Sequence, residues 1–285
     1  MKTFYKTSKL EKHIEKLKSE GKTIGFTPTM GALHNGHFTL MKRTGEENDI
    51  SVCSIFVNPT QFNAASDLDK YPRTLEKDAQ GLASIGCDIL YAPTEEEIYP
   101  NGSDYKVDVD LNGLDKEMEG AHRPGHFEGV VQVVKRLIEV TSCNRLYMGQ
   151  KDFQQFTIIR QMINDLKMDT ELVVCPIVRD EDGLAKSSRN VRLLPEHRKK
   201  APIIHRVLEQ ALHWIDEGRS PIEITYKAME YLEIPGFKPE YFDIVDGTTL
   251  KKITSSENID LIVACTAVWA GDVRLIDNMV LRGSV

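Results

Sequence analysis

Short apolar runs alternate with longer stretches of helical periodicity over the first 178 residues of the chain. The apolar runs predict buried strands at 22–28, 50–59, 87–93, 144–149 and 170–178. The periodic stretches predict helices at 37–48, 75–86, 127–142 and 152–167. Repeated strand–helix–strand units fold with right-handed crossovers into a parallel sheet. The pattern therefore predicts an α/β fold, a Rossmann-like doubly wound parallel sheet, in residues 1–178.

The pattern changes after residue 178, where a polar loop leads into a different order of elements. Helices are predicted at about 196–217 and 221–233. Apolar runs predict strands at 241–246, 259–270 and 273–281, and the Gly-Asp pair between the last two predicts an antiparallel turn. Residues 179–285 are therefore expected to form a second, smaller α+β domain that begins with the polar loop.

The composition is typical of a soluble globular protein, with 41% hydrophobic and 28% charged residues among 285. A net charge of −7 disfavours a nucleic acid or a membrane surface as partner, because both select a basic face. Residues 1–22 have a charged, amphipathic helix pattern without the apolar core of a signal peptide. No apolar stretch reaches the ~18 residues that span a bilayer. We therefore expect a cytoplasmic protein.

The five cysteines lie far apart and include no C-x-x-C pair. This spacing is poor for zinc, and an odd count fits a reduced compartment better than a disulfide framework. Most of the cysteines lie in apolar runs. We therefore expect buried, inert thiols and no metal held by the protein itself.

The loop PTMGALHNGH leaves the first predicted strand and contains His34 and His37. Gly31 permits a close approach of backbone and ligand. Asn35 or Gly36 is placed to cap a helix that begins near His37. Residues three apart share a helix face, and a helix N-terminus favours anions, so the histidine pair is predicted to contact phosphate. A zinc site would need further ligands, and a solvated polar turn is the remaining alternative.

The polar loop GLAKSSRN follows the last strand of the predicted parallel sheet. It offers two cations and two hydroxyls in the consecutive residues Lys186, Ser187, Ser188 and Arg189. Such a cluster suits a triphosphate and the charge that moves onto a departing pyrophosphate. Alone it is a common kind of surface loop. Combined with the histidine pair at the same edge of the sheet, it predicts a nucleotide site.

Two further loops at strand ends carry amides. FVNPTQF offers Asn58 and Gln61, and GQKDFQQF offers Lys151, Asp152 and Gln155. Amides donate and accept hydrogen bonds, so they suit a small molecule with hydroxyls and a carboxylate, whereas Lys151 supplies a point charge for a phosphate. Asp152 is placed either to accept from a ribose hydroxyl or to cap the following helix.

The stretch HRPGHFEGV leads into a predicted helix and leaves two interpretations open. In one, Arg123 reaches a phosphate from a mobile loop. In the other, Arg123 and His126 cap the helix and pack the loop.

The H-x-G-H pair at the first strand–helix junction, with a KMSKS-like basic loop later in the chain, resembles the signature of the nucleotidyltransferase superfamily. Five segments in matching order narrow the resemblance to the pantoate–β-alanine ligase family: PTMGALHNGH, FVNPTQF, HRPGHFEGV, GQKDFQQF and LAKSSRN. The resemblance extends over about residues 22–195. The set is specific as a whole, whereas no single segment is.

This resemblance implies an enzyme that condenses pantoate with β-alanine at the expense of ATP, through a pantoyl adenylate, releasing AMP and pyrophosphate. It implies catalytic roles for His34, His37, Lys151, Ser187, Ser188 and Arg189, with His37 as the proton donor. It implies an ATP site formed by Met30, Gly31, Ala32, Leu33, His34, Asn35, Gly36, His37, Gly149, Gln150, Lys151, Asp152, Val178, Lys186, Ser187, Ser188 and Arg189. Gln61 and Gln155 would bind pantoate, and Gln61 would also contact β-alanine. The resemblance also implies Mg²⁺, held mainly by the ATP phosphates. It implies that the protein is a homodimer.

Two positions differ from the form common in that family: Gln150 stands where a glutamate is common, and Lys186 where a methionine is common. Neither difference removes a charge that the mechanism requires. Three other functions fit parts of the pattern: another adenylyl- or cytidylyltransferase acting on a small phosphorylated metabolite, a short aminoacyl-tRNA synthetase-like protein, and an inactive nucleotide sensor. The acidic chain disfavours the second, and the intact set of charged groups disfavours the third. The first would not need the amides of Asn58, Gln61 and Gln155.

Overall fold

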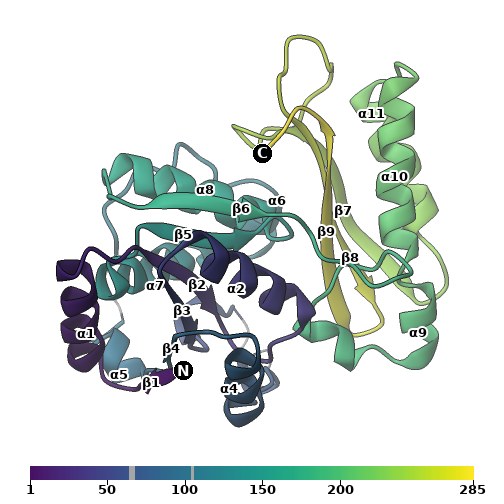
Figure 1. The fold of residues 1–285 in the computed structure, drawn as a ribbon. Coiled ribbons are helices and arrows are strands. Elements are labelled where there is room, and N and C mark those ends of the chain that lie inside the picture. The colour runs from purple at the N-terminus through teal and green to yellow at the C-terminus, as the bar shows by residue number, and fades with distance from the viewer. Residues whose placement is uncertain (64–67, 104–105) are drawn as a thin grey trace.

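The larger part of the molecule is built on one six-stranded parallel sheet (Figure 1). The computed structural model describes residues 1–63, 68–103 and 106–285. The strands are β1 (Lys2–Phe4), β2 (Ile24–Thr29), β3 (Ile50–Ile55), β4 (Ile89–Tyr91), β5 (Arg145–Gly149) and β6 (Glu171–Cys175). Their order is β1-β4-β3-β2-β5-β6, and all of the pairs are parallel. The order reverses between β2 and β5, which is where open α/β sheets form their ligand crevice.

Helices cover both faces of this sheet. One face carries α1 (Thr7–Ser19), α7 (His126–Thr141) and α8 (Phe153–Asp165), and the other carries α2 (Asn35–Glu47) and α4 (Leu75–Ser84). The shorter elements of this part are η1 (Pro59–Gln61), α5 (Glu95–Ile98) and α6 (Met118–His122). Helix α7 is the most central because its apolar residues recur at helical spacing and most of its side chains are buried. It packs against β2, α8 and η1 and so holds together the elements that border the crevice.

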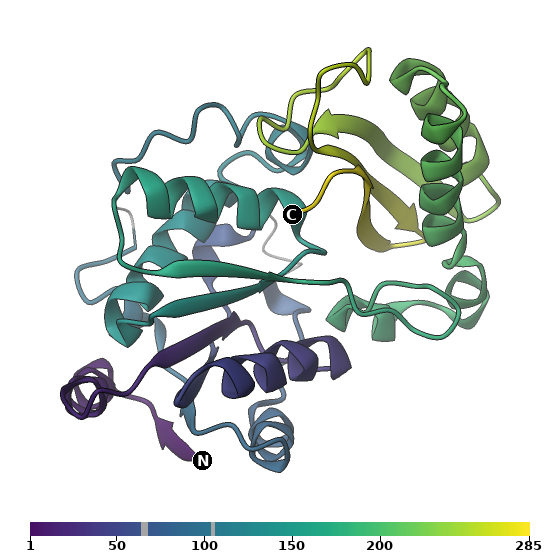
Figure 2. The same cartoon turned by 45° about the horizontal axis from the view of Figure 1, so that its top comes forward.

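A second, smaller unit follows. It contains η2 (Ser188–Arg192), α9 (Pro195–Lys200), α10 (Ile203–Asp216), α11 (Pro221–Leu232), β7 (Phe237–Asp246), β8 (Ile262–Ala270) and β9 (Val273–Arg282). The three strands form an antiparallel sheet in the order β7-β8-β9. Figures 1 and 2 show α10 and α11 on one face of this sheet and the larger unit on the other. Val245, Val263 and Ala267 on the inner face belong to the same buried cluster as β2 and α7, so the two units share one core.

The structure confirms the predicted class, a doubly wound parallel sheet with a smaller α+β unit. Among the differences from the predicted elements, three have a clear local cause. Strand β1 lies within the stretch predicted as helix; it has only three residues, too few to display a strand pattern. The predicted helix at 196–217 is divided at Pro202, whose ring disfavours a continuous helix. Strand β7 begins four residues before its predicted start and includes Pro239, which an edge strand tolerates because no ladder bond is lost there. Within the described residues, no helix is both long and apolar enough to cross a bilayer.

We predict that the close contact between α7 and η1 depends on Gly129. A Cβ at this position would lie 2.5 Å from the Thr60 carbonyl oxygen and 2.8 Å from the Gln61 nitrogen, and both are backbone atoms. Gly129→Ala should lower the free energy of unfolding by about 1–3 kcal/mol, because overpacking outweighs the gain in helix propensity. Urea denaturation measures the change.

The matched control is Gly45→Ala, on α2. Its Cβ would meet Ser51 at an ordinary 3.9 Å. This variant should gain up to about 1 kcal/mol from helix propensity alone. Equal or higher stability of both variants would show that the α7–η1 contact yields to a methyl group.

Candidate active site

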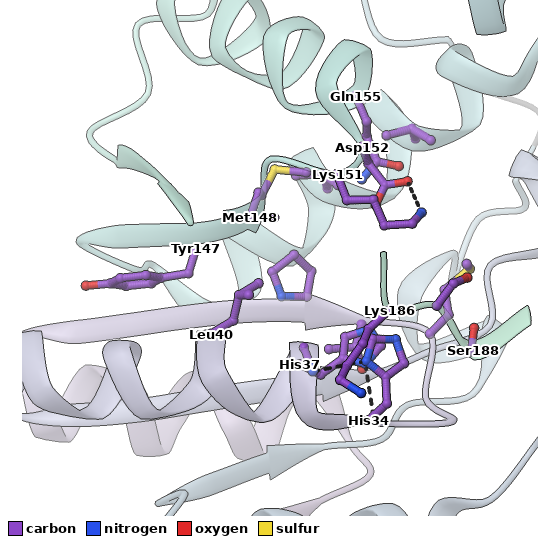
Figure 3. A pocket seen from close by; sticks show the side chains of 18 of the residues that line it. His34, His37, Leu40, Tyr147, Met148, Lys151, Asp152, Gln155, Lys186 and Ser188 are labelled. Carbon is purple, nitrogen blue, oxygen red and sulfur yellow. Dashed lines mark hydrogen bonds and ion pairs between the residues drawn. The ribbon is translucent and has the colours of Figure 1, made fainter. Parts of the chain in front are cut away.

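One cavity lies at the carboxyl ends of the central strands and is lined by the loops that follow β2, β3, β5 and β6 (Figure 3). Fourteen of the nineteen residues that the family resemblance assigns to the site lie on its wall, beside Asn58: Met30, His34, Gly36, His37, Gln61, Gly149, Lys151, Asp152, Gln155, Val178, Lys186, Ser187, Ser188 and Arg189. The five others lie off the wall: Gly31, Ala32, Leu33, Asn35 and Gln150. Helix α7 adds an apolar stretch of wall that the loop motifs do not reveal, formed by Val130, Val133, Val134 and Leu137.

The two histidines cap the helix whose N-terminus faces this cavity. The Gly36 N–H donates to Nδ1 of His34 at 3.1 Å, and the His34 N–H donates to Nδ1 of His37 at 3.3 Å. Helix α2 therefore begins at Asn35, two residues before the predicted start, with His34 as its N-cap. The prediction that Asn35 or Gly36 caps the helix was wrong, because an imidazole nitrogen supplies the acceptor that an Asn side chain usually provides.

These caps also fix the tautomer of each ring. Because a backbone N–H occupies each Nδ1, the proton of the neutral ring lies on Nε2, so each ring retains one donor for a ligand. Burial, then the charges of Lys151 and Lys186, lower the pKa of His34 to about 4. Burial, then the neighbouring His34 and Lys151, lower the pKa of His37 to about 3. The ring centroids are 4.1 Å apart, and both rings are neutral at pH 7 in the free protein.

The loop before the histidines is shaped by Asp78, a residue that the sequence motifs did not identify. Asp78 is 2% exposed, and its carboxylate accepts 2.8 Å hydrogen bonds from the backbone N–H groups of Ala32 and Leu33. Gly31 has φ +81°, and a Cβ there would lie 3.1 Å from this carboxylate. Asp78 shares the buried face of α4 with Leu82, four residues later. The sequence signal that could have identified Asp78 is a charged residue at a position on the apolar face of the predicted helix.

The amides of the second loop have two different roles. Asn58 is 1% exposed; its Nδ2 donates to Gln61 Oε1 at 3.2 Å and to the Gly129 carbonyl at 3.1 Å, while its Oδ1 accepts from Tyr99 at 2.9 Å. The prediction that Asn58 offers its amide to a substrate therefore does not fit these contacts. Asn58 orients Gln61, whose Nε2 donates to the weak acceptor Met30 Sδ at 3.1 Å. Gln61 thus keeps donor capacity for a ligand.

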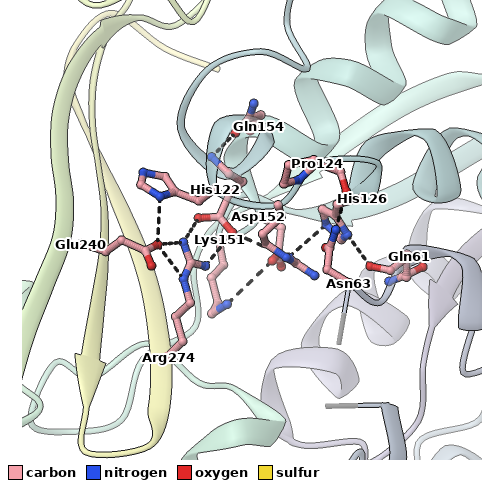
Figure 4. Close-up of polar contacts among 12 residues, drawn as sticks. Gln61, Asn63, His122, Pro124, His126, Lys151, Asp152, Gln154, Glu240 and Arg274 are labelled. Carbon is pink, nitrogen blue, oxygen red and sulfur yellow. Dashed lines mark hydrogen bonds and ion pairs between the residues drawn. The ribbon is translucent and has the colours of Figure 1, made fainter. Parts of the chain in front are cut away.

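His126 contacts the main chain of Gln61 (Figure 4), and Arg123 contacts His126 in turn. Nδ1 of His126 lies 2.8 Å from the Gln61 carbonyl oxygen, and Nε2 lies 3.1 Å from Nη1 of Arg123. Arg123 is always a donor, so Nε2 accepts and the proton lies on Nδ1, the opposite tautomer to that of the α2 histidines. Burial, then the charge of Arg123, lower the pKa of His126 to about 4. This arrangement agrees with the packing interpretation of the two residues.

The chain of contacts continues into the smaller unit. Arg123 pairs with Glu119 at 3.6 Å, and Arg274 on β9 holds both Glu119 oxygens at 2.7 and 2.8 Å. Tyr241 on β7 donates to the same carboxylate at 2.8 Å. Burial alone would raise the pKa of Glu119, but the bonds and charge of Arg274, with Tyr241 and Arg123, lower it to about 2. A buried carboxylate therefore joins the two units next to the site.

The loop after β5 presents Lys151 and Asp152 to the cavity, and the first turn of α8 presents Gln155, from the side facing the histidines (Figure 3). Lys151 Nζ lies 3.8 Å from Asp152 Oδ1. Asp152 occupies the N-cap position of α8, but its side chain makes no cap hydrogen bond there. Of the two roles left open for Asp152, helix capping by the side chain is not the one observed, and the carboxylate remains available to a ligand.

The basic loop closes the remaining side. Lys186 forms a close ion pair with Asp180, and Arg198 contacts the same carboxylate at 3.2 Å. The backbone N–H of Lys186 donates to the Val178 carbonyl at 2.9 Å. Ser187 caps η2 by accepting from the Arg189 N–H at 3.2 Å. In the free protein the ammonium of Lys186 is thus neutralised by a carboxylate.

A Rossmann-like sheet with neutral imidazole donors at a helix N-terminus, and with lysines and an arginine on the facing loops, defines a nucleotide-dependent enzyme of the nucleotidyltransferase type. The chain belongs to the pantoate–β-alanine ligase family, since the family model described as Pantoate-beta-alanine ligase matches residues 2–280.

Relatives and solved structures agree with this family. The chain is 45% identical to the pantothenate synthetase of Bacteroides fragilis over 289 residues, which cover 100% of both chains. It is 47% identical to the pantothenate synthetase of Porphyromonas gingivalis over 280 residues, which cover 98% of this chain and 99% of that one. The crystal structure of pantothenate synthetase from Thermus thermophilus matches with TM-score 0.92 and 40% identity over 99% of this chain and 100% of that one. Pantoate-beta-alanine ligase from Francisella tularensis, complexed with Beta-gamma ATP and β-alanine, matches with TM-score 0.82 and 37% identity over 99% and 98%.

The depressed pKa of His37 predicts a pH dependence of stability. Its pKa is about 3 in the folded protein and about 6.5 in an unfolded chain, so unfolding takes up a proton between these values. The contribution of His37 is complete above pH 6.5 and is lost progressively as the pH falls towards 3. His37→Asn keeps a side-chain acceptor for the His34 N–H but does not titrate. Its unfolding free energy should therefore fall less steeply between pH 6.5 and 5, by up to about 1.4 kcal/mol per pH unit.

Urea denaturation at a series of pH values measures this difference in slope. His13→Asn, on α1, is the comparison for an outer, less buried histidine, and its slope should stay closer to that of the parent protein. Parallel curves for the parent and His37→Asn would contradict the assignment of His37 as a neutral buried ring.

Proposed function

We propose that this protein joins pantoate to β-alanine at the expense of ATP, forming pantothenate, AMP and pyrophosphate through a pantoyl adenylate. One observation carries the proposal: neutral imidazole donors and the cations of lysine and arginine side chains lie in the same cavity as the amides of Gln61 and Gln155. The first group suits a triphosphate, and the second suits the carboxylate and hydroxyls of a small acid. The match to the Francisella protein, which is complexed with Beta-gamma ATP and β-alanine, supports the same assignment.

The proposal assigns each part of the substrates to a part of the cavity wall. The α-phosphate lies against the Nε2–H groups of His34 and His37, and Lys151 faces them across the cavity. Ser187, Ser188 and Arg189 bind the β- and γ-phosphates, joined by Lys186 once it leaves Asp180. Gly149, Lys151, Asp152 and the Val178 backbone border the nucleoside. Pantoate lies between Gln61 and Gln155 with its methyl groups on the apolar wall of α7, and β-alanine enters beside Gln61.

The chemistry then proceeds in two transfers. A carboxylate oxygen of pantoate attacks the α-phosphorus, the bond to the bridging oxygen breaks, and pyrophosphate leaves with that electron pair. The preorganised donors stabilise the charge that grows on the phosphate oxygens. In the second transfer the neutral amine of β-alanine attacks the acyl carbon, and AMP leaves. Because AMP is a much better leaving group than hydroxide, the adenylate makes an otherwise poor acyl donor reactive.

Mg²⁺ accompanies ATP in this proposal and is held mainly by phosphate oxygens and water. Within residues 1–63, 68–103 and 106–285, no three His, Cys, Asp or Glu side chains gather as a ready metal site. We also infer, from family resemblance, a cytoplasmic homodimer with a domain boundary near residue 178.

A three-substrate assay tests the proposal. AMP and pyrophosphate should accumulate only when ATP, pantoate and β-alanine are all present, whereas exchange of labelled pyrophosphate into ATP should need ATP and pantoate alone. His37→Ala should lower turnover by roughly 10²- to 10³-fold, as loss of one preorganised donor does. His13→Ala, whose ring stacks on Phe4 away from the cavity, is the matched control and should keep full turnover. Exchange that ignores pantoate would identify a different adenylyltransferase, and full turnover of His37→Ala would remove this residue from the mechanism.

A second prediction concerns the support of Gln61. His126→Ala removes the donor that holds the Gln61 carbonyl, so KM for pantoate should rise roughly tenfold, while KM for ATP should change little. His126→Asn keeps an N–H donor and should recover part of the affinity. His122→Ala, four residues earlier, is the control, because its ring stacks on Tyr241 and does not contact Gln61. Equal increases in KM for both substrates would point to general loosening instead.

A further inference from the structure

Strand β9 presents two different faces. Val273, Leu275 and Leu281 pack into the cluster beneath α10 and α11, together with Met279. The alternate residues Ile276 and Val280 pack against the core of the larger unit. Arg274 and Asn278 have the same parity as these two, so their side chains project towards the larger unit as well. Arg274 binds the Glu119 carboxylate, which connects through Arg123 and His126 to Gln61. Asn278 contacts the loop after β5, on the opposite side of the active site.

Asn278 is 2% exposed, and all of its side-chain hydrogen-bonding groups have partners. Its Nδ2 donates to the Gln150 carbonyl at 3.0 Å and to the Lys151 carbonyl at 2.8 Å. Its Oδ1 accepts from Gln150 Nε2 at 3.3 Å. The residues that it joins are 127 and 128 positions away in the sequence. A buried amide in which both donors hold one short loop restrains that loop strongly.

The position of Asn278 is itself fixed. Its backbone N–H donates to Asp277 Oδ1 at 2.8 Å. Asp277 is 4% exposed and forms a two-pronged ion pair with Arg179 at 2.6 and 3.1 Å. Arg179 lies on the chain between the two units, directly after the cavity residue Val178. The amide that holds the loop after β5 is therefore anchored to a rigid strand.

The loop after β5 needs such an anchor because few other contacts hold it. The Gln150 N–H bonds to the Cys175 carbonyl at 2.8 Å, and the Asp152 N–H bonds to the Gly149 carbonyl at 3.3 Å. The Gln150 and Lys151 carbonyls take their side-chain donors from Asn278. Besides burial, the charge of Lys151 lowers the pKa of both His34 and His37, so its placement contributes to the electrostatics of the phosphate side of the cavity.

We propose that Asn278 is a positioning residue for the reaction. It holds the main chain at Gln150 and Lys151 so that the Lys151 ammonium faces the histidine pair. This inference rests on the proposed function, in which Lys151 binds phosphate. It also gives the side chain of Gln150 a structural partner on β9 in place of a contact with the nucleotide.

The test compares Asn278→Asp with Lys151→Ala and with the double variant. Asn278→Asp keeps the shape but replaces both donors by a carboxylate facing two carbonyl oxygens. In the pantoate-dependent pyrophosphate exchange, kcat/KM for ATP should fall about 10- to 100-fold, as misplacement of a group by about 1 Å does. KM for pantoate should stay within about twofold, because Gln61 and Gln155 are held elsewhere. Combined with Lys151→Ala, Asn278→Asp should cost little more, since its effect passes through Lys151.

Asn278→Ala repeats the test without a new charge should the aspartate variant fold poorly. Val280→Ala, on the same face of β9, is the matched control for loss of packing; it should lower the melting temperature and leave kcat and KM unchanged. Two results would overturn the inference. One is a double variant in which the losses of kcat/KM for ATP multiply. The other is full kcat/KM for ATP in both Asn278 variants while Lys151→Ala is impaired. Full exchange activity of Lys151→Ala would instead overturn the proposed role of Lys151.

Discussion

The parallel pairing of β2 with β3 on one side and β5 on the other is the constraint on which the site depends. Parallel strands end at the same edge, so the loops after them meet without any bending of the sheet. The order reverses between β2 and β5, and their crossover helices leave in opposite directions and open a crevice there. The histidine loop follows β2 and the Lys151 loop follows β5, so the two phosphate-facing groups lie on opposite sides of this crevice.

Burial then decides which of these groups carry charge. Lysine ammonium groups and an arginine supply the cations, whereas His34 and His37 remain neutral because both are desolvated beside Lys151. A neutral ring with its proton on Nε2 donates a hydrogen bond without adding a like charge to a crowded basic site. The same residue type takes the opposite tautomer at His126, where the ring donates to the Gln61 carbonyl and accepts from Arg123. One side-chain chemistry thus performs two tasks, and the backbone partners select between them.

The interface between the two units has a polar centre surrounded by apolar side chains. Glu119, Arg274 and Tyr241 form a buried, fully paired cluster, and loss of one partner from such a cluster costs about 3–5 kcal/mol. The ion pair uses both carboxylate oxygens, which adds geometric specificity to the docking of β9 on α6. Asn278 lies four residues further along the same strand. Strand β9 therefore contacts residues that position both sides of the cavity: Arg274 on the side proposed for pantoate, and Asn278 on the side proposed for the nucleotide. The smaller unit therefore contributes to the geometry of a site whose lining comes mostly from the larger one.

The sequence by itself determined most of the strands and helices and the chemistry of the loops, because periodicity and loop composition are local properties. On that basis His34, His37, Lys151 and Gln61 were expected at one edge of a parallel sheet, and they line one cavity. Only the tertiary structure decided which polar atoms remain available to a ligand. Asn58 turns to the Gly129 carbonyl 71 residues away, and Asn278 reaches Lys151 across 127 residues. A hydrogen bond between distant segments leaves no periodic trace in the chain, since it depends on the meeting of surfaces that folding alone brings together.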